Sequence, residues 1–138
     1  SVLEIGTGAG YATALVSQLA RQVLTIERCQ SLALEAATRL ESFGATNVRV
    51  AWADALADSA PAGPFDRILV HALIEEPLRQ FTDRLAATGA IVAARLAPSG
   101  RGQRIVKIVR LAEGGFRAEE IGPARSLAPL AAGLSRGL

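Results

Sequence analysis

The chain has 138 residues, about one domain's worth, and half of them are apolar while a fifth are charged. This balance excludes a disordered tail, and no apolar run reaches the roughly 18 residues that a membrane-spanning helix needs. The formal net charge of +2 combines a net −3 over residues 1–66 with a net +5 over residues 67–138. The basic residues, 14 Arg and one Lys, form no run of five or six, so nucleic-acid binding is not indicated.

Short apolar runs alternate with amphipathic stretches of helical length in the first half of the chain. Strands are predicted for three apolar runs, Val2–Ile5, Val23–Glu27 and Val48–Trp52. Helices are predicted for residues 11–21 and 31–43, with a glycine at position 44 placed to end the second one. Residues 53–64, after the third strand, contain two Pro and a Gly and are predicted to be a loop, with one short helical turn as an option.

The second half of the chain begins in the same way and then changes. Strands are predicted at residues 67–70 and 90–94, with a helix at residues 77–87 between them. Residues 104–111 and 116–121 flank a Glu-Gly-Gly turn and predict an antiparallel hairpin. No element is predicted for the Pro-, Ala- and Leu-rich end of the chain. The order of elements predicts an α/β sheet with right-handed crossovers, which binds ligands beyond the carboxyl ends of its strands.

Signals for targeting and for metal binding are scarce. No segment of the signal-peptide type is visible, and we expect a cytoplasmic protein with no membrane partner. The lone Cys29 excludes a disulfide framework and a cysteine-rich zinc site, and we expect no metal. A packed, small apolar residue is the expected role of Cys29, with a nucleophile as the alternative. Because Ser1 opens directly onto an apolar strand, we expect upstream sequence to be missing.

A glycine-rich loop, LEIGTGAGY, leaves the first predicted strand and enters the first predicted helix. Its glycines stand at alternate positions, which allows tight turning and close approach of a ligand. The dinucleotide fingerprint would need a glycine where Tyr11 stands, so the spacing differs from that motif. Glu4 lies two positions before the first glycine. A pyrophosphate gains nothing from this carboxylate, whereas a ligand with an ammonium and a sulfonium does. A purely structural turn is the alternative.

Two further acidic residues follow strand ends. Glu27 closes the second strand, where its carboxylate can accept both hydroxyls of a ribose; pairing with Arg28 or Arg49 is the alternative. Asp54 stands just past the third strand, where it can accept a hydrogen bond from an exocyclic amine such as that of adenine. An ordinary loop or helix-cap aspartate is the alternative for Asp54.

The sequence resembles class I S-adenosylmethionine-dependent methyltransferases and, more narrowly, the protein-L-isoaspartate O-methyltransferase family. Six stretches carry the resemblance: residues 2–11 (VLEIGTGAGY), 23–28 (VLTIER), 47–55 (NVRVAWADA), 63–70 (GPFDRILV), 102–103 (GQ) and 125–130 (RSLAPL). The resemblance implies a mostly parallel, Rossmann-like sheet of seven strands with a C-terminal antiparallel hairpin. We expect one domain over residues 1–138, lacking its N-terminal part.

The resemblance also implies an activity and a set of site residues. The activity is transfer of a methyl group from S-adenosyl-L-methionine to the carboxylate of L-isoaspartyl residues in damaged proteins or peptides, which is a protein-repair reaction. The matching motifs assign to cofactor binding Glu4, Gly6, Thr7, Gly8, Gly10, Glu27, Arg28, Asp54, Ala55 and Gln103. In this assignment the glycine loop lines the methionine part, Glu27 holds the ribose, and Arg28 with Asp54-Ala55 meets the adenine.

The segment after the fourth strand departs from the family pattern. His71 and the residues after it replace a Thr-Ala-Ala-like segment, so His71 is a candidate for catalytic contact with the acceptor, with a structural histidine as the alternative. Glu75 and Glu76 could orient His71, repel an anionic substrate or form the polar first turn of a helix. Two other functions stay open: a methyltransferase of this fold for a small molecule or modified peptide, and a non-catalytic cofactor-binding domain. The oligomeric state is not indicated.

Overall fold

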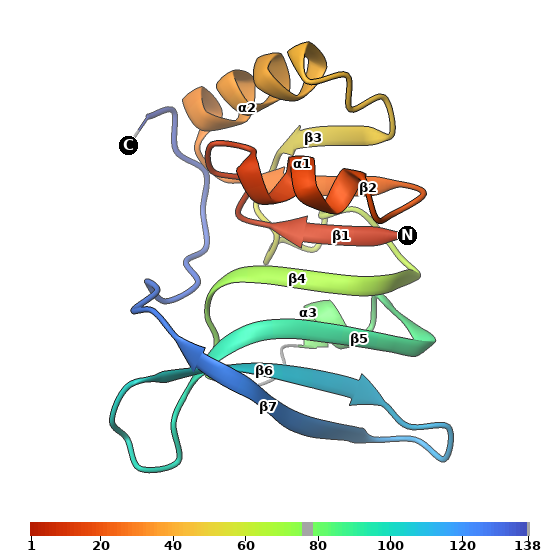
Figure 1. Ribbon diagram of the computed structural model, residues 1–138, viewed down its shortest axis with the longest axis vertical. Helices are drawn as coiled ribbons and strands as arrows, with labels where there is room; N and C mark the ends of the chain where they lie inside the picture. The colour runs from red at the N-terminus through yellow and green to blue at the C-terminus, as the bar shows by residue number, and fades with distance from the viewer. Residues whose placement is uncertain (76–78, 138) are drawn as a thin grey trace. The chain divides into compact units, whose positions relative to one another are not determined.

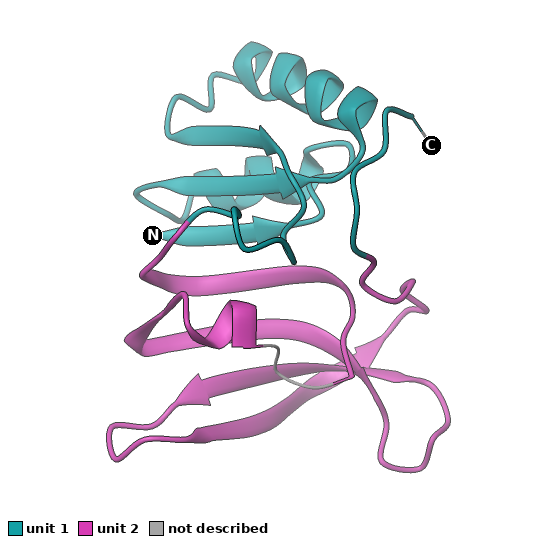
Figure 2. Ribbon diagram, turned by 180° about the vertical axis from the view of Figure 1, so that it is seen from behind, with its two compact units in different colours: residues 1–61, 132–138 teal, residues 62–131 magenta. Residues whose placement is uncertain are grey.

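The computed structural model describes residues 1–75 and 79–137. By their internal contacts these residues divide into two compact units, Ser1–Pro61 with Ala132–Leu138 as unit 1, and residues 62–131 as unit 2 (Figure 2). The strands form the seven-stranded mixed sheet that the family resemblance implies. Among the described residues, no helix is both long enough and apolar enough to cross a membrane.

Unit 1 contains three parallel strands in the order β3-β2-β1, connected by two helices (Figure 1). The strands are β1 (Val2–Ile5), β2 (Val23–Glu27) and β3 (Val48–Trp52), with the predicted bounds. Val23 pairs with Val2 on one side and with Val48 on the other. The helices, which pack on this sheet, are α1 (Tyr11–Ser17) and α2 (Gln30–Ser42). The core of unit 1 consists of strand residues such as Leu3 and Ile26 and of the buried residues of α2, which are Ala33, Ala36 and Leu40.

The two helices of unit 1 end for different reasons. Helix α1 is shorter than the prediction of residues 11–21, because Asn47 Nδ2 donates to the carbonyl oxygens of Ser17 and Ala20, 2.8 Å away in both cases. The bond to Ser17 satisfies a carbonyl that a helix extended to residue 21 would use itself. Helix α2 ends one residue before the predicted limit. Gly44 follows with a φ of 80°, which confirms its predicted role as the stop.

Unit 2 contains two parallel strands and an antiparallel hairpin in the order β4-β5-β6-β7. The strands are β4 (Phe65–Leu73), β5 (Leu85–Leu96), β6 (Gln103–Arg110) and β7 (Phe116–Ala124). Ile68, Ile91 and Ile108 are fully or almost fully buried, one in each of three neighbouring strands. Burying such a side chain contributes about 1.5–3 kcal/mol relative to leaving it exposed. The predicted hairpin is confirmed, with its turn closed by Leu111 and Gly115.

The helix predicted at residues 77–87 is wrong in its extent. Helix α3 spans only Arg79–Thr82, and β5 begins at Leu85 rather than at residue 90. Pro77 lies outside the described residues. The Phe65 N–H donates to the Arg84 carbonyl oxygen at 2.8 Å, and Leu85 pairs with Phe65 in the sheet. Pairing with a strand twenty residues away therefore overrides the local helix propensity of an Ala-rich stretch.

Candidate functional site

The glycine loop between β1 and α1 has the backbone that its sequence predicts. Gly6, Gly8 and Gly10 have φ angles of 91°, 53° and 84°, in the left-handed region that favours glycine. A Cβ added to Gly10 would lie 3.4 Å from the Leu40 side chain, so Gly10 lets the loop approach α2. A Cβ added to Gly8 would meet nothing within 4 Å. Gly8 therefore borders open space, as a loop that receives a ligand must.

Glu27 connects this loop to the start of α2. Its side chain is 6% exposed, and its Oε2 accepts a hydrogen bond from the Gly8 N–H at 3.0 Å. The Oε1 atom accepts from the Cys29 N–H at 2.9 Å. Both oxygens thus face backbone donors rather than the Arg28 or Arg49 side chains that the alternative assignment invoked. Because each carboxylate oxygen has two acceptor positions, Glu27 retains capacity for ligand hydroxyls.

Glu4, in β1, and Thr7, in the glycine loop, are both buried. Glu4 is 0% exposed, and its Oε2 accepts from Thr13 Oγ1 in α1 at 2.5 Å. The Thr7 hydroxyl is buried and hydrogen-bonded to the Thr25 hydroxyl of β2 at 2.6 Å. These two hydrogen bonds connect the end of β1 and the loop to α1 and β2. Direct contact of either side chain with a cofactor stays a prediction.

Two of the three residues assigned to the adenine, Arg28 and Asp54, bond to a distant part of the chain. Asp54 Oδ1 accepts from the Leu56 N–H at 2.9 Å, as in an ordinary loop aspartate, and its Oδ2 accepts from the Gly133 N–H at 2.6 Å. Arg28 Nε donates to the Gly133 carbonyl oxygen at 2.9 Å. Ala55, beside Asp54, is buried. Arg28 and Asp54 are therefore brought together through one glycine that sequence reasoning did not single out.

Residues 133–136, the 133–136 segment from here on, also reach the start of α2. The N–H groups of Gln30 and Ser31 donate to the carbonyl oxygens of Ser135 and Arg136, at 2.8 and 3.2 Å. The only sequence signal for this contact was indirect. Cys29 occupies the position before α2 where a Ser, Thr, Asp or Asn side chain usually caps the helix, and its sulfur is a weaker acceptor than the oxygens of those side chains. The free N–H groups of the first turn thus needed acceptors from elsewhere.

Cys29 itself is 4% exposed, which confirms the predicted packed position. The Ser31 hydroxyl lies 3.3 Å from Cys29 Sγ and, together with the Leu32 N–H, holds the pKa of this thiol below its ordinary value. The buried position of this thiol fits packing better than a role as a nucleophile.

The remaining candidates belong to unit 2. His71 is exposed on β4, within an irregular stretch of its pairing with β5. Gln103 forms two hydrogen bonds with Leu127: Nε2 donates to the carbonyl oxygen at 2.9 Å, and Oε1 accepts from the N–H at 2.8 Å. Both ends of the Gln103 amide are thus engaged by backbone. The Glu75 carbonyl oxygen accepts from Arg95, whereas Glu76 lies outside the described residues.

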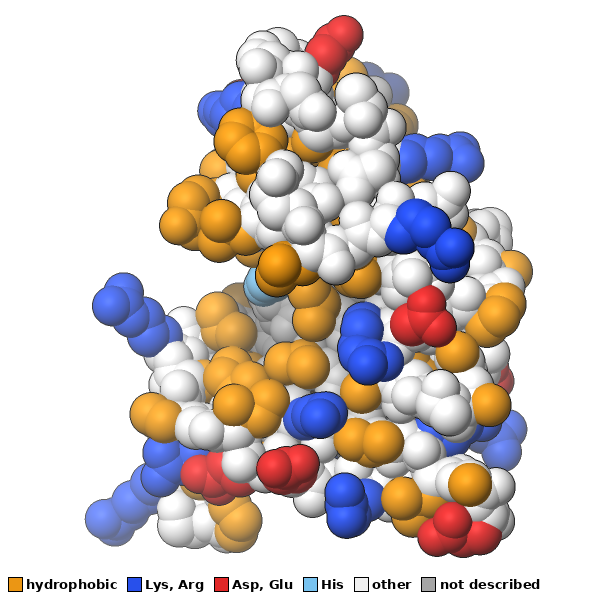
Figure 3. All heavy atoms as spheres, turned by 45° about the vertical axis from the view of Figure 1, so that its right-hand side comes forward, with side chains coloured by type: hydrophobic (Ala, Val, Ile, Leu, Met, Phe, Trp, Pro, Cys, Tyr) orange, Lys and Arg blue, Asp and Glu red, His pale blue; other side chains and the backbone are white. Residues whose placement is uncertain are grey.

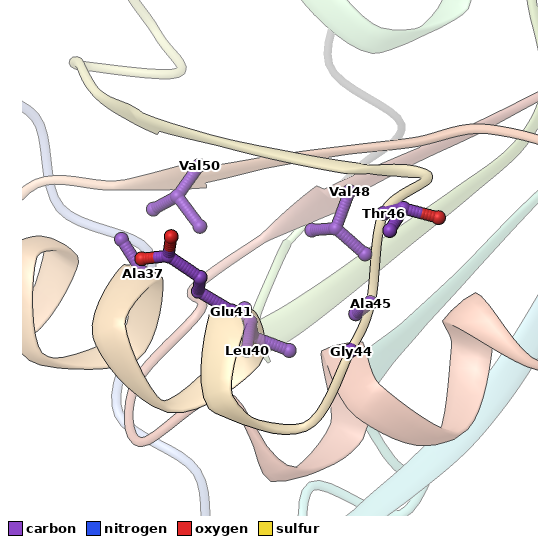
Figure 4. Close-up of a pocket in the computed structure, with 8 residues that line it drawn as sticks. All are labelled: Ala37, Leu40, Glu41, Gly44, Ala45, Thr46, Val48 and Val50. Carbon is purple, nitrogen blue, oxygen red and sulfur yellow. The ribbon is translucent and has the colours of Figure 1, made fainter.

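Two surface features are unrelated to this site. An open pocket of about 280 Å³ lies between the end of α2 and the start of β3, where Glu41 points toward Val50 (Figure 4). It lies at the amino end of β3, whereas α/β sheets bind ligands beyond the carboxyl ends of their strands. On the face that Figure 3 shows, Lys and Arg side chains are interspersed with acidic and hydrophobic ones rather than gathered in one basic patch.

A family model described as protein-L-isoaspartate(D-aspartate) O-methyltransferase (PCMT) matches residues 1–128. The chain belongs to this family. It is 41% identical over 137 residues to the protein-L-isoaspartate O-methyltransferase of Rhodopseudomonas palustris (strain BisB18), covering 99% of this chain and 62% of that protein. It is 39% identical over 137 residues to the enzyme of that name from Caulobacter vibrioides (strain NA1000 / CB15N), covering 98% of this chain and 60% of that protein. The chain thus spans about three fifths of the length of these relatives.

Solved structures show the same fold. One is a beta-aspartate methyltransferase (PCMT) from Plasmodium falciparum in complex with S-adenosyl-L-homocysteine. It matches with a TM-score of 0.75 at 18% identity, covering 94% of this chain and 65% of that one. A protein-L-isoaspartate O-methyltransferase structure matches with a TM-score of 0.80 at 21% identity, covering 97% of this chain and 43% of that one. The fold is therefore that of class I methyltransferases, as the sequence resemblance implied.

Proposed function

We propose that this chain is the cofactor-binding part of an S-adenosyl-L-methionine-dependent methyltransferase that methylates the carboxylate of L-isoaspartyl residues in proteins or peptides. The observation that carries the proposal is the bridge made by Glu27. Its carboxylate joins the Gly8 N–H to the start of α2, at the carboxyl end of β2, in a chain of this family. This arrangement leaves acceptor positions on a buried carboxylate beside an open stretch of glycine backbone.

The residues of unit 1 fit an S-adenosyl-L-methionine molecule. The glycine loop, Gly6 to Gly10 with Thr7, would line its methionine part, because the open space at Gly8 admits a ligand against bare backbone. Glu27 would accept the ribose hydroxyls. Arg28, Asp54 and Ala55 would meet the adenine, and Glu4 would support the loop through Thr13. When bound, this cofactor supplies an electrophilic methyl group on a sulfonium.

A carboxylate acceptor agrees with the presence of a single histidine in the sequence. An aspartyl-type carboxyl group has an ordinary pKa of about 4, so the acceptor is already ionised at neutral pH. The protein then has to hold the carboxylate roughly 3 Å from the methyl carbon, in line with the leaving sulfur, and no general base is required. The sequence contains one histidine, His71. A partner peptide that carries an isoaspartyl residue is the substrate class that this chemistry favours.

A second candidate is a methyltransferase of the same fold for a small molecule or a modified peptide. The observation that favours it is the exposed His71 on β4, in the segment that departs from the family pattern. A phenol or amine acceptor would gain from such a base. In that case isoaspartyl peptides would give no turnover, although the cofactor product would still bind.

The test uses the full-length protein. We expect S-adenosyl-L-homocysteine to bind in calorimetry, and NAD not to bind, because Tyr11 replaces the third glycine of the dinucleotide loop. We expect an isoaspartyl peptide, and not the same peptide with a normal aspartyl residue, to give S-adenosyl-L-homocysteine at a measurable rate. Absence of S-adenosyl-L-homocysteine binding would contradict the cofactor assignment, and binding without turnover of the isoaspartyl peptide would contradict the acceptor.

A further inference from the structure

The 133–136 segment bonds to two of the residues that the proposed function assigns to the adenine, Arg28 and Asp54. Gly133 bonds to the side chains of Asp54 and Arg28, through its N–H and its carbonyl oxygen respectively. The Ser135 N–H donates to the Arg28 carbonyl oxygen at 2.9 Å, and Trp52 Nε1 donates to that same oxygen at 3.1 Å. Figure 1 shows the chain end running past the carboxyl ends of the unit 1 strands to the start of α2.

These bonds restrict two side chains that would otherwise move. Arg28 is exposed and Asp54 is half-exposed, and a surface side chain samples several rotamers unless a partner holds it. Both partners here are backbone atoms of one residue, Gly133, whose φ of 90° requires glycine. A Cβ at this position would meet nothing within 4 Å, so glycine is needed for the backbone conformation rather than for space.

We propose that the 133–136 segment is a positioning element for the base of the cofactor, which holds Arg28 and Asp54 so that the site selects a base with an amino group. This inference rests on the proposed function, since it assumes that the site takes an adenosyl ligand. The selectivity follows from the chemistry of Asp54. An ionised carboxylate only accepts hydrogen bonds, so it favours an N–H donor on the base and disfavours a carbonyl oxygen at the same position.

The experiment compares two ligands on matched variants of the full-length protein. S-adenosyl-L-homocysteine carries the 6-amino group, and S-inosyl-L-homocysteine carries an oxygen there. A chain ending at residue 132 loses the whole segment, whereas a chain ending at residue 136 keeps every bond described above. Gly133→Ala strains a left-handed backbone, whereas Gly137→Ala changes a glycine that also borders open space but has no such φ.

We expect the wild type and both controls to bind the adenosyl ligand at least about tenfold more tightly than the inosyl ligand, since a hydrogen bond to a charged group contributes about 1.5–3 kcal/mol. In the chain ending at residue 132 and in Gly133→Ala, the adenosyl affinity falls and the ratio of the two affinities shrinks to within about threefold. A merely structural role would weaken both ligands equally and leave the ratio unchanged.

Cys29 reports independently whether the segment has been released. Cys29 is buried, and its backbone pairs with Ser135 of the segment in a single parallel bridge. Alkylation of Cys29, followed by peptide mass spectrometry, should be at least about tenfold faster in the chain ending at residue 132 than in the chain ending at residue 136, since removal of the segment uncovers the thiol. Circular dichroism spectra identify any variant that fails to fold. If the chain ending at residue 132 does not fold, the ligand affinities of Gly133→Ala test the proposal instead.

The outcomes separate the two proposals. If wild-type protein does not bind S-adenosyl-L-homocysteine, the proposed function fails. If it binds with the expected preference, but release of the segment changes neither affinity nor ratio, only the positioning role is overturned. Tighter adenosyl binding after removal of the segment would also overturn it, because the segment would then compete with the base for Asp54.

Discussion

The glycine loop and the 133–136 segment meet the same short stretch of chain, Glu27 to Ser31, from two directions. The loop reaches Glu27 across 19 positions of sequence, through the Gly8 N–H. Gly133 reaches Arg28 across 105 positions and Asp54 across 79. The loop was visible in the sequence because its function demands particular residue types. The segment was not visible, because it acts through backbone groups that nearly every residue possesses.

This difference predicts how substitutions will behave in the two regions. In the loop, side-chain changes at single positions should have large effects, because glycine and glutamate are required there. At Gln103, whose partner Leu127 contributes only backbone groups, a side-chain change should affect stability more than ligand affinity. The four predictions below test that contrast, beginning with the largest expected effect.

Gly8→Val should abolish cofactor binding, lowering the affinity for S-adenosyl-L-homocysteine more than about a hundredfold, because the new side chain projects into the open space where the ligand would approach the backbone. Gly44→Val is the matched control, since Gly44 also has a positive φ and open space around it. Both variants should lose about 1–2 kcal/mol of stability, from the left-handed backbone. Calorimetric affinity within threefold of wild type for Gly8→Val would remove the loop from the site.

Glu27→Ala should weaken S-adenosyl-L-homocysteine binding at least about tenfold, because hydrogen bonds to a charged acceptor contribute about 1.5–3 kcal/mol each. It also frees the Gly8 and Cys29 N–H groups, which loosens the loop. Glu35→Ala removes an exposed carboxylate of α2 whose ion pair with Arg39 is a surface pair, and it should leave the affinity unchanged. Equal affinities of the two variants in calorimetry would contradict the ribose assignment.

Gln103→Ala should lower the free energy of unfolding by about 1–3 kcal/mol, since it leaves both the N–H and the carbonyl oxygen of Leu127 without their partner. Urea denaturation measures this change, with the exposed Gln22→Ala as the control. The affinity for S-adenosyl-L-homocysteine should stay within threefold of wild type. A tenfold loss of affinity at unchanged stability would instead make Gln103 a cofactor-binding residue, as the family resemblance implied.

His71→Ala should have the smallest effect, less than about threefold on the turnover of an isoaspartyl peptide, because an ionised carboxylate acceptor needs no base. For the same reason the rate of the wild type should be nearly flat from about pH 6 to 8, provided that chemistry limits it. A rate that rises with pH and falls roughly a hundredfold in His71→Ala would transfer the protein to the second candidate function.

The sequence alone was sufficient wherever a short stretch of chain determines its own structure. The strands of unit 1 have their predicted bounds because each is a short apolar run that suits a strand, and β1 and β2 are buried on both faces. Gly44 ends α2 and the glycine loop follows β1 because positive φ angles call for glycine. Glu27 was assigned to the site from its place at the end of β2, and its bond to the Gly8 N–H is consistent with that position.

Only the tertiary structure decided the features that depend on distant partners. Leu85 is in a strand rather than a helix because Phe65 pairs with it. Gln103 is engaged by Leu127, and Asp54 by Gly133, through backbone N–H groups that carry no sequence signature. The physical reason is the same in each case. A hydrogen bond to a backbone group depends on where the chain passes in space, and because nearly every residue carries the same backbone groups, the residue type does not reveal that position.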